Sequence, residues 1–376
     1  MNSEPELKIS RATITLIDVP LLEPFVVSYD SYSSMPSVIL TLETDDGLIG
    51  YGESVPDGHI TGETPTGTVE ALRTELIPAV LGLDPRDITA VHQQLNRALK
   101  GCGAAKAAVD IACWDLAGKA ANRPIYSLLG GRRPEQPTIA RVMSILAPET
   151  LAEQAVQARS QGYRHLKMKL GGGDGLDIER VRAVREAIGS DLAIRVDANQ
   201  GWADPATARE MIAALEPYGI DWVEQPLHAD DIDGFKLLRQ ATGARLMADE
   251  SVVDADDLGR FVRDRSVDMV NLKLMKSGGI TPCHRLATQA ELGGLKVQIG
   301  SMLETSIASA AGFHLALSHP NIVSTELSGP VKFAREPGNL QYVLPEVQIG
   351  EGPGLGVDVD LDVLADLTVS ECGVTA

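Results

Sequence analysis

The fold is decided by a stretch that begins with His165-Leu-Lys-Met-Lys-Leu170 and ends with Met269-Val-Asn-Leu-Lys-Leu274. Three more short apolar runs lie between these two: Ala193-Ile-Arg-Val-Asp-Ala-Asn199, Asp221-Trp-Val-Glu-Gln-Pro226 and Leu246-Met-Ala-Asp-Glu250. The charges that close the last four runs, Asp197, Glu224, Asp249 and Lys273, are spaced by 27, 25 and 24 residues. One strand, one loop and one helix fill such a step, which is the period of a (β/α) barrel. Because the carboxyl ends of parallel barrel strands meet at one face, we expect these charges to converge there.

The composition is that of a globular enzyme. The chain has 376 residues, 44% hydrophobic and 23% charged, which is enough for one large barrel or two domains. A net charge of −19 argues against nucleic acid and anionic membrane as partners. Residues 1–6 are polar and acidic, unlike a signal peptide, and no apolar run approaches the length of about 18 residues that a membrane span needs. The cysteines, with no CxxC spacing and no disulfide framework, indicate free thiols in a reducing compartment; they are Cys102, Cys113, Cys283 and Cys372. We expect a cytoplasmic α/β enzyme.

The pattern changes twice along the chain. Residues 7–55 alternate as strands do, over Ala12–Ile17, Ser37–Leu42 and Leu48–Tyr51, and Thr66–Ala121 then takes a helical period. A glycine-marked exit near residue 130 precedes strict β/α alternation. The predicted fold is therefore α/β: a modified TIM (β/α) barrel over 131–334, with an α+β capping domain over 1–130. The segment 335–376 contains β-like sequence, and we expect it to return to the cap or to close the barrel.

The barrel region predicts eight strands joined by helices. Besides the five runs above, the expected strands are Thr138–Ile145, Lys296–Ile299 and Ile322–Leu327. The expected helices are Pro148–Gln161, Asp177–Ile188, Pro205–Leu215, Ile232–Thr242, Asp254–Arg265, Thr281–Leu292 and Ser306–Leu317.

Asp197, Glu224 and Asp249 predict a metal site, because three carboxylates on consecutive strands make a compact site of oxygen ligands. Such a site suits Mg²⁺ best, and Mn²⁺ would also bind; three protein ligands leave positions for water and substrate. Any one acid alone could merely cap a loop, but three in register with the barrel period argue against that. Asn199 and Glu250, each beside an expected ligand, are either supporting groups of the metal site or solvated loop residues.

Three lysines predict the chemistry. Lys167 and Lys169 are two residues apart on one strand, so their side chains share a face, and Lys273 ends another strand across the barrel. If Lys167 and Lys169 faced outward, two charges would lie against the helices, where unpaired lysines are rare. A lysine pair that flanks a metal suits proton abstraction and return on the two faces of one carbon. Such a base must have a lowered pKa: at about 10.4 only about one lysine in 2,500 is neutral at pH 7, and lowering it to about 7.5 takes about 4 kcal/mol.

These residues resemble the enolase superfamily, in its muconate-lactonizing subgroup, over nearly the whole chain. The motifs that carry the resemblance, besides the lysine and metal strands, are Pro24-Phe-Val-Val-Ser-Tyr29, Gly50-Tyr-Gly-Glu-Ser54, His59-Ile-Thr-Gly-Glu63, Lys106–Lys119, Asn271-Leu-Lys-Leu-Met-Lys-Ser-Gly-Gly-Ile280 and Gly300-Ser-Met-Leu-Glu304. The resemblance implies a metal-dependent racemase or epimerase that takes the α-proton of a small carboxylate substrate through an enolate. It implies Asp197, Glu224 and Asp249 as metal ligands, Lys169 and Lys273 as acid/base groups, and substrate binding by Lys167, Ser301 and Glu326. It also implies a homo-oligomer.

Three activities within the subgroup compete. Dipeptide epimerases carry Asp-x-Asp at the end of strand eight to hold the dipeptide ammonium, where this chain has Glu326-Leu-Ser328. Muconate cycloisomerases share Glu-x-x-Gly-Pro there, similar to Glu326–Pro330, but differ after strand seven, at Gly300–Ser306. The cap loops and Thr325–Phe333 are most similar to those of N-succinylamino acid racemases acting on basic amino acids, and we expect that activity. A non-enzymatic scaffold would have lost a ligand or a base, and none is missing.

The cap loops predict the side-chain preference. The loops Phe25–Ser37 and Val55–Thr66 hold four acidic or imidazole side chains but no lysine or arginine; the four are Asp30, Asp57, His59 and Glu63. Acids without a nearby base suit a guanidinium or ammonium group. The alternative is that these acids are ordinary solvated residues of an acidic chain.

Overall fold

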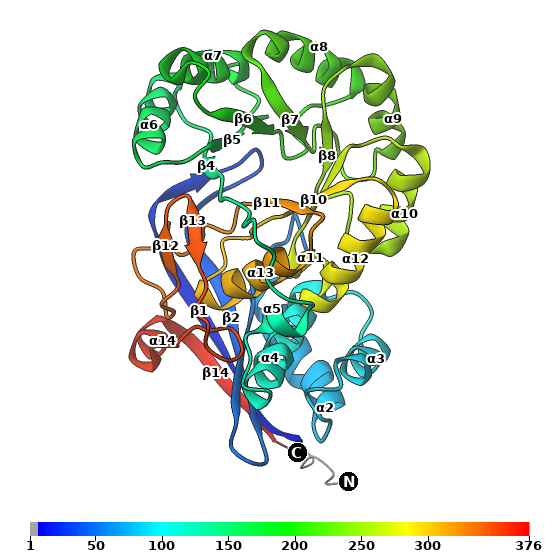
Figure 1. The fold of residues 1–376 in the computed structure, drawn as a ribbon, viewed down its shortest axis with the longest axis vertical. Helices are drawn as coiled ribbons and strands as arrows, with labels where there is room; N and C mark the ends of the chain where they lie inside the picture. Colours follow the sequence, from blue (N-terminus) through cyan, green and yellow to red (C-terminus); the bar gives the residue numbers. More distant parts are fainter. Residues whose placement is uncertain (1–6, 376) are drawn as a thin grey trace.

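The computed structural model describes residues 7–375, with the backbone alone at 347 and 348. Residues 1–6 lie outside the described part, and so does the expectation that they are no signal peptide. A parallel sheet ringed by helices forms the upper part of the molecule in Figure 1, and an antiparallel sheet with its own helices forms the lower part. The predicted α/β fold, a barrel with an N-terminal capping domain, is confirmed.

The parallel sheet contains eight strands whose order in space is their order in the chain. They are β4 (Arg141–Met143), β5 (His165–Lys169), β6 (Ala193–Asp197), β7 (Ile220–Glu224), β8 (Leu246–Ala248), β9 (Met269–Leu272), β10 (Lys296–Ile299) and β11 (Ile322–Thr325). An isolated parallel bridge between Ile139 and Thr325 joins the segment before β4 to β11. The register pairs Lys169 with Asp197 and Asp197 with Glu224, so these side chains end their strands at one level.

Helices connect the strands close to the predicted bounds. They are α6 (Pro148–Ser160), α7 (Asp177–Ile188), α8 (Pro205–Leu215), α9 (Ile232–Ala241), α10 (Ala255–Asp264), α11 (Leu274–Ser277), α12 (Ile280–Leu292) and α13 (Ser306–Ser318), with a 3₁₀ turn at Glu216–Tyr218. Asp204, Asp231 and Asp254 each accept a hydrogen bond from a backbone N–H in the first turn of the helix that follows, which fixes its start. Helix α13 is buried on nearly all sides and packs against the cap, which its small alanine and serine residues allow.

The cap is a sheet of β1 (Ile9–Val26), β2 (Ser31–Thr44) and β3 (Ile49–Ser54), packed against helices. The helices are α1 (Pro65–Ala71), a π-helical turn (Leu72–Leu76), α2 (Ile77–Val80), α3 (Ile88–Ala98), α4 (Gly103–Ala120) and α5 (Ile125–Leu128). Strands β1 and β2 are longer than predicted, because a register shift between Pro20 and Phe25 accommodates prolines that break the alternation. Their hairpin thus extends to the barrel (Figure 1), where Ile145 N donates to Val26 O (3.0 Å).

The C-terminal segment returns to the cap. Strand β14 (Thr368–Thr375) pairs antiparallel with β1, which gives the sheet order β14-β1-β2-β3. A small hairpin, β12 (Gln341–Val343) and β13 (Glu346–Gln348), precedes it, together with a helix, α14 (Leu361–Leu367). Asp360 accepts hydrogen bonds from the N–H groups of residues 362 and 363 and starts this helix. We propose 1–130, 131–334 and 335–376 as the limits of cap, barrel and C-terminal segment.

Two further sequence expectations concern the helices and the cysteines. Within residues 7–375, none of the helices combines the length and the apolar character that crossing a membrane requires. The four cysteines are free thiols, and Cys113 and Cys283 are buried.

Candidate active site

Three acidic side chains meet at the carboxyl ends of β6, β7 and β8. Asp197 ends β6, Glu224 ends β7 and Asp249 directly follows β8, and one carboxylate oxygen of each lies within 4.8 Å of the others. All three are completely buried, so their mutual repulsion requires nearby positive charge. Glu224 Oε2 has no hydrogen-bond partner among the described residues, which leaves a buried oxygen free to bind a cation. An all-oxygen set of this size fits a hard divalent ion such as Mg²⁺.

Lys169 and Lys273 lie on opposite sides of these acids. Lys169 Nζ is 2.8 Å from Asp197 Oδ2, and Lys273 Nζ is 2.8 Å from Asp249 Oδ2. They come from β5 and from the end of β9, the strands that flank β6–β8 in the sheet. Both also line one cavity, here called the active-site cavity. The two lysines thus reach this cavity from different strands.

Lys167 lies deeper, among the acids. Its Nζ is 2.9 Å from Asp197 Oδ2, 2.8 Å from Glu224 Oε1 and 2.8 Å from Glu326 Oε2. Its side chain faces the barrel interior, not the surrounding helices, and is only 2% exposed. With three carboxylates in contact, its three N–H groups have protein partners already. Lys167 thus balances the buried negative charge.

The charges shift the pKa values of these groups in opposite directions. Burial alone would raise the pKa of Asp197, but Lys167 and Lys169 outweigh it and lower this pKa to about 2. Burial and the charge of Asp197 raise the pKa of Glu224. Burial would lower the pKa of Lys273, but the charges of Asp249 and Glu250 outweigh it and raise this pKa. The lowered lysine pKa expected from the sequence depends on a metal at these acids and stays a prediction.

The two residues predicted to support the site contact each other. Asn199 Nδ2 donates to Glu250 Oε1 (3.0 Å), and the backbone N–H of Asn199 donates to Asp197 Oδ1 (2.8 Å). Burial and the charges of Asp249 and Asp197 raise the pKa of Glu250 to about 7. Asn199 thereby orients one expected ligand and holds a second acid beside it, and both residues are buried.

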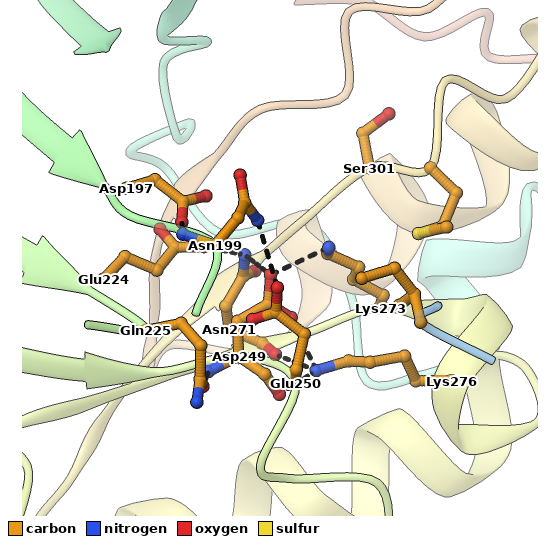
Figure 2. A network of polar contacts seen from close by, with 12 residues as sticks. Asp197, Asn199, Glu224, Gln225, Asp249, Glu250, Asn271, Lys273, Lys276 and Ser301 are labelled. Atoms are coloured by element: carbon orange, nitrogen blue, oxygen red, sulfur yellow. Dashed lines mark hydrogen bonds and ion pairs between the residues drawn. The ribbon is translucent and has the colours of Figure 1, made fainter. Parts of the chain in front are cut away.

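Three further residues orient the acids and were not identified from the sequence. Asn271 Nδ2 donates to Glu224 Oε1 (2.8 Å), and Lys276 Nζ donates to Asp249 Oδ1 (2.7 Å). Gln225 Oε1 accepts from the backbone N–H of Asp249 (2.9 Å). Figure 2 shows Lys273 and Lys276 approaching Asp249 from the same side. Asn271 could have been found, because it lies two residues before Lys273 on one strand and so shares its face; for Lys276 and Gln225 the sequence carries no comparable signal.

Ser301 and Glu326 both line the active-site cavity, as their predicted contact with substrate requires. Ser301 Oγ donates to Glu304 Oε2 (2.6 Å) and lies apart from the cluster of acids (Figure 2). Glu326 Oε1 accepts from Lys167 Nζ (2.9 Å), Asn271 Nδ2 (2.9 Å) and Gln298 Nε2 (3.1 Å). One of these donors is the ammonium of Lys167, so the charge of Glu326 is already balanced, which disfavours a second cation there.

Of the four cap-loop side chains singled out from the sequence, only Asp57 lines the active-site cavity. Its carboxylate accepts from Tyr32 Oη (2.8 Å) and from the backbone N–H groups of His59 and Ile60 (2.8 and 2.9 Å). Asp30 is exposed, and the ring of His59 packs against Tyr29 with centroids 4.6 Å apart. The pocket role expected for Glu63 is wrong: its carboxylate accepts from the N–H groups of residues 104 and 105 and caps α4.

One cation was missed by considering the cap loops alone. Lys332, in the segment after β11, lines the active-site cavity, and its Nζ lies 4.1 Å from the centroid of the Phe25 ring. Besides Lys169, Lys273 and Glu326, the cavity therefore presents one more acid, Asp57, and one more cation, Lys332, from two different parts of the chain.

Comparison with known protein families gives two matches that follow the two parts of the fold. Residues 10–130 match the mandelate racemase/muconate lactonizing enzyme N-terminal domain, and residues 150–363 match the enolase C-terminal domain-like family. The chain belongs to the enolase superfamily.

Relatives in this superfamily are racemases, epimerases and cycloisomerases. The N-succinyl-L-Arg/Lys racemase of Bacillus cereus is 46% identical over 96% of this chain and 98% of the relative, and its crystal structure superposes with a TM-score of 0.96 over 98% and 100% of the two chains. The hydrophobic dipeptide epimerase of Enterococcus faecalis is 38% identical over 93% of this chain and 99% of its own. Its structure, in complex with Mg and the dipeptide L-Leu-L-Tyr, has a TM-score of 0.90 over 93% of this chain and 99% of that one. This enolase-superfamily chain is therefore an isomerase of the racemase/epimerase type.

Proposed function

We propose that this chain is a metal-dependent racemase of N-succinyl derivatives of arginine and lysine, which inverts the α-carbon with two lysines. The observation that carries the proposal is the placement of Lys169 and Lys273 on either side of three buried carboxylates, in one cavity. The similarity to the Bacillus cereus racemase over nearly the full length of both chains supports the substrate class.

Asp197, Glu224 and Asp249 are proposed to hold Mg²⁺, and Mn²⁺ would also suit them. Such an ion supplies positive charge that holds the substrate carboxylate and offsets the charge that develops on it. Asn199, Glu250, Gln225, Asn271 and Lys276 are proposed to position the ligands through the hydrogen bonds described above. The relatives crystallised with Mg support the choice of metal.

The two lysines are proposed to share the proton transfer. The neutral amine of one lysine takes the α-proton, and the bonding electrons pass into the carboxylate as the α-carbon becomes planar. The ammonium of the other lysine returns a proton to the opposite face, which inverts the centre. In the reverse direction the lysines exchange roles. The neutral form needs a pKa nearer 7, and metal binding acts in that direction because it offsets the charge of Asp249 that raises the pKa of Lys273.

Contacts with the substrate are proposed from the cavity wall. Asp57 is the acid placed to receive a guanidinium or ammonium group, and Ser301 and Glu326 face the substrate from the barrel. Lys167 is proposed to act through the carboxylates that surround it and to supply positive charge near the substrate carboxylate. A homo-oligomeric assembly and a cytoplasmic location remain predictions from the sequence.

The second candidate is a dipeptide epimerase, favoured by the 38% identity to the Enterococcus faecalis enzyme. A dipeptide brings a free ammonium, which needs an acceptor. Glu326 already binds Lys167, Asn271 and Gln298, and Ser328 is neutral. The part of the cavity that these two residues line is therefore poorly suited to the dipeptide ammonium. An N-acylated amino acid brings no such ammonium, and this difference favours the racemase.

A substrate panel with a chiral readout tests the assignment. The Mg²⁺-loaded enzyme is given N-succinyl-arginine, -lysine, -alanine and -phenylalanine, with Ala-Glu and lysine-containing dipeptides alongside, and kcat/KM is measured for each. We expect turnover of the succinyl compounds, with the basic ones favoured by roughly 10- to 150-fold, the worth of a charge-assisted hydrogen bond. Turnover of the dipeptides alone would transfer the assignment to the dipeptide epimerases.

A further inference from the structure

Lys332 is a cation without an acidic partner in the wall of the active-site cavity. Among the described residues, its side chain makes only one hydrogen bond, a long one from Nζ to Val142 O (3.4 Å). No carboxylate oxygen of the described residues lies within 4.0 Å of its Nζ, and the charges that act on it are those of three cations, Arg141, Lys169 and Lys167, and of Glu326. Since a half-buried lysine normally has an anionic partner, this amino group has capacity for one.

The backbone presents Lys332 in a fixed position. Its N–H donates to Gly329 O (2.8 Å), and its carbonyl oxygen accepts from Leu22 N of strand β1 (2.8 Å). The Phe25 ring below Nζ and the Val142 carbonyl hold the end of the side chain. Little conformational freedom remains to be lost when an anion binds there.

A second cation lies beyond Lys332. A neighbouring cavity of about 460 Å³, here called the side cavity, shares Phe25, Val142 and Lys332 with the active-site cavity. Arg141 lines the side cavity, and no described carboxylate lies within 4.0 Å of its guanidinium. The one acid that lines the side cavity is the exposed Glu23. In a chain of net charge −19, this is a locally electropositive place.

We propose that Lys332, with Arg141 behind it, binds the terminal carboxylate of a dicarboxylic N-acyl group such as succinyl, and thereby selects acidic over neutral acyl groups. The inference rests on the proposed function and assigns the acyl specificity of that site. In the proposed function the reacting carbon lies between Lys169 and Lys273. Lys332 lines the same cavity, within which the acyl chain of the substrate must lie.

The charges around the cavity agree with this assignment. Burial, followed by the charges of Arg141 and Lys169, lowers the pKa of Lys332 well below its ordinary value, while Glu326 opposes them. An anion at this point relieves the repulsion among the cations. Asp57 lines the same cavity and lies more than 4.0 Å from Lys332, so the two charges do not neutralise each other. In a substrate with a basic side chain and an acidic acyl group, the basic group can pair with Asp57 and the acyl carboxylate with Lys332.

The test compares two acyl groups of equal chain length on one amino acid. The Mg²⁺-loaded full-length enzyme is assayed for racemisation of N-succinyl-L-arginine and N-butanoyl-L-arginine, in which a methyl group replaces the carboxylate. We expect wild type to prefer the succinyl compound at least tenfold in kcat/KM, mainly through KM. Lys332→Met should reduce this preference tenfold or more, whereas the matched control Lys296→Met, an exposed lysine at the start of β10, should leave it unchanged.

Each outcome separates the acyl assignment from the proposed function. If wild type turns over both compounds without preferring the succinyl one, the role proposed for Lys332 is wrong, and the chain is still an N-acyl amino acid racemase. This outcome does not depend on the folding of any variant. Equal losses on both compounds in Lys332→Met overturn the proposed role as well, because they indicate a structural role. If wild type turns over neither compound, the proposed function itself fails.

Discussion

Replacing Asp57 by asparagine tests the preference for basic side chains. The substitution removes the charge and keeps the shape, so the backbone N–H groups of His59 and Ile60 still have an oxygen to bind, and Tyr32 Oη can accept from the new amide. The turn over 57–62 should therefore survive. What is lost is the charge-assisted hydrogen bond to the substrate's guanidinium or ammonium group.

The magnitude follows from the contacts that Asp57 already makes. A charge-assisted hydrogen bond contributes about 1.5–3 kcal/mol, or roughly 10- to 150-fold in kcat/KM. Three protein donors already bind this carboxylate, which leaves about one of its four acceptor positions for the substrate. We therefore expect a loss at the lower end, about 10- to 30-fold for N-succinyl-arginine, and less than threefold for N-succinyl-alanine.

Asp30→Asn is the matched control. Asp30 belongs to the same cap loops and carries the same charge, but it is exposed and lies outside the cavity lining, so its loss should change neither rate by more than about twofold. Initial rates of racemisation for both substrates, measured by polarimetry with all three proteins, give the ratios. Equal losses on both substrates in Asp57→Asn, or the same shift in Asp30→Asn, would refute a local contact between Asp57 and the basic side chain.

Three other predictions follow from the site and the core. Exhaustive EDTA treatment should abolish turnover and added Mg²⁺ should restore it, because three buried carboxylates need a cation; undiminished activity after chelation contradicts the metal site. In deuterated water, Lys273→Ala should lose α-proton exchange from one enantiomer by about 10²- to 10⁴-fold while Lys169 still serves the other, whereas undiminished racemisation rules out the two-lysine mechanism. His314 is buried and neutral, because its Nδ1 accepts from Tyr126 N (3.2 Å), its Nε2 lies 3.0 Å from Leu355 O, and burial lowers its pKa from 6.5 to about 4. The unfolded state therefore binds a proton that the folded state does not, and the free energy of unfolding should fall by about 3 kcal/mol from pH 6.5 to pH 4; urea titrations of His314→Gln should lack this part of the decrease, and an unchanged pH dependence contradicts it.

Most of the fold was predictable because it depends on periodicity. The eight strands and seven longer barrel helices fall within a few residues of the predicted bounds, since polar and apolar residues alternate there at the period of each element. Strand β1 is longer than predicted because a local feature overrides the pattern there. Its prolines break the alternation, and a register shift allows the strand to continue.

The sequence by itself determined the barrel and the convergence of its acids and lysines. A regular step of strand, loop and helix leaves few ways for parallel strands to close, so residues at successive strand ends must meet at one face. The partners of each side chain were decided only by the tertiary structure. Lys167 contacts Glu326, 159 residues away, and Lys332 reaches a cavity that the cap loops cover. No local pattern encodes such contacts, because the pKa and the role of a buried charge depend on which distant groups the closed fold places within a few ångströms of it.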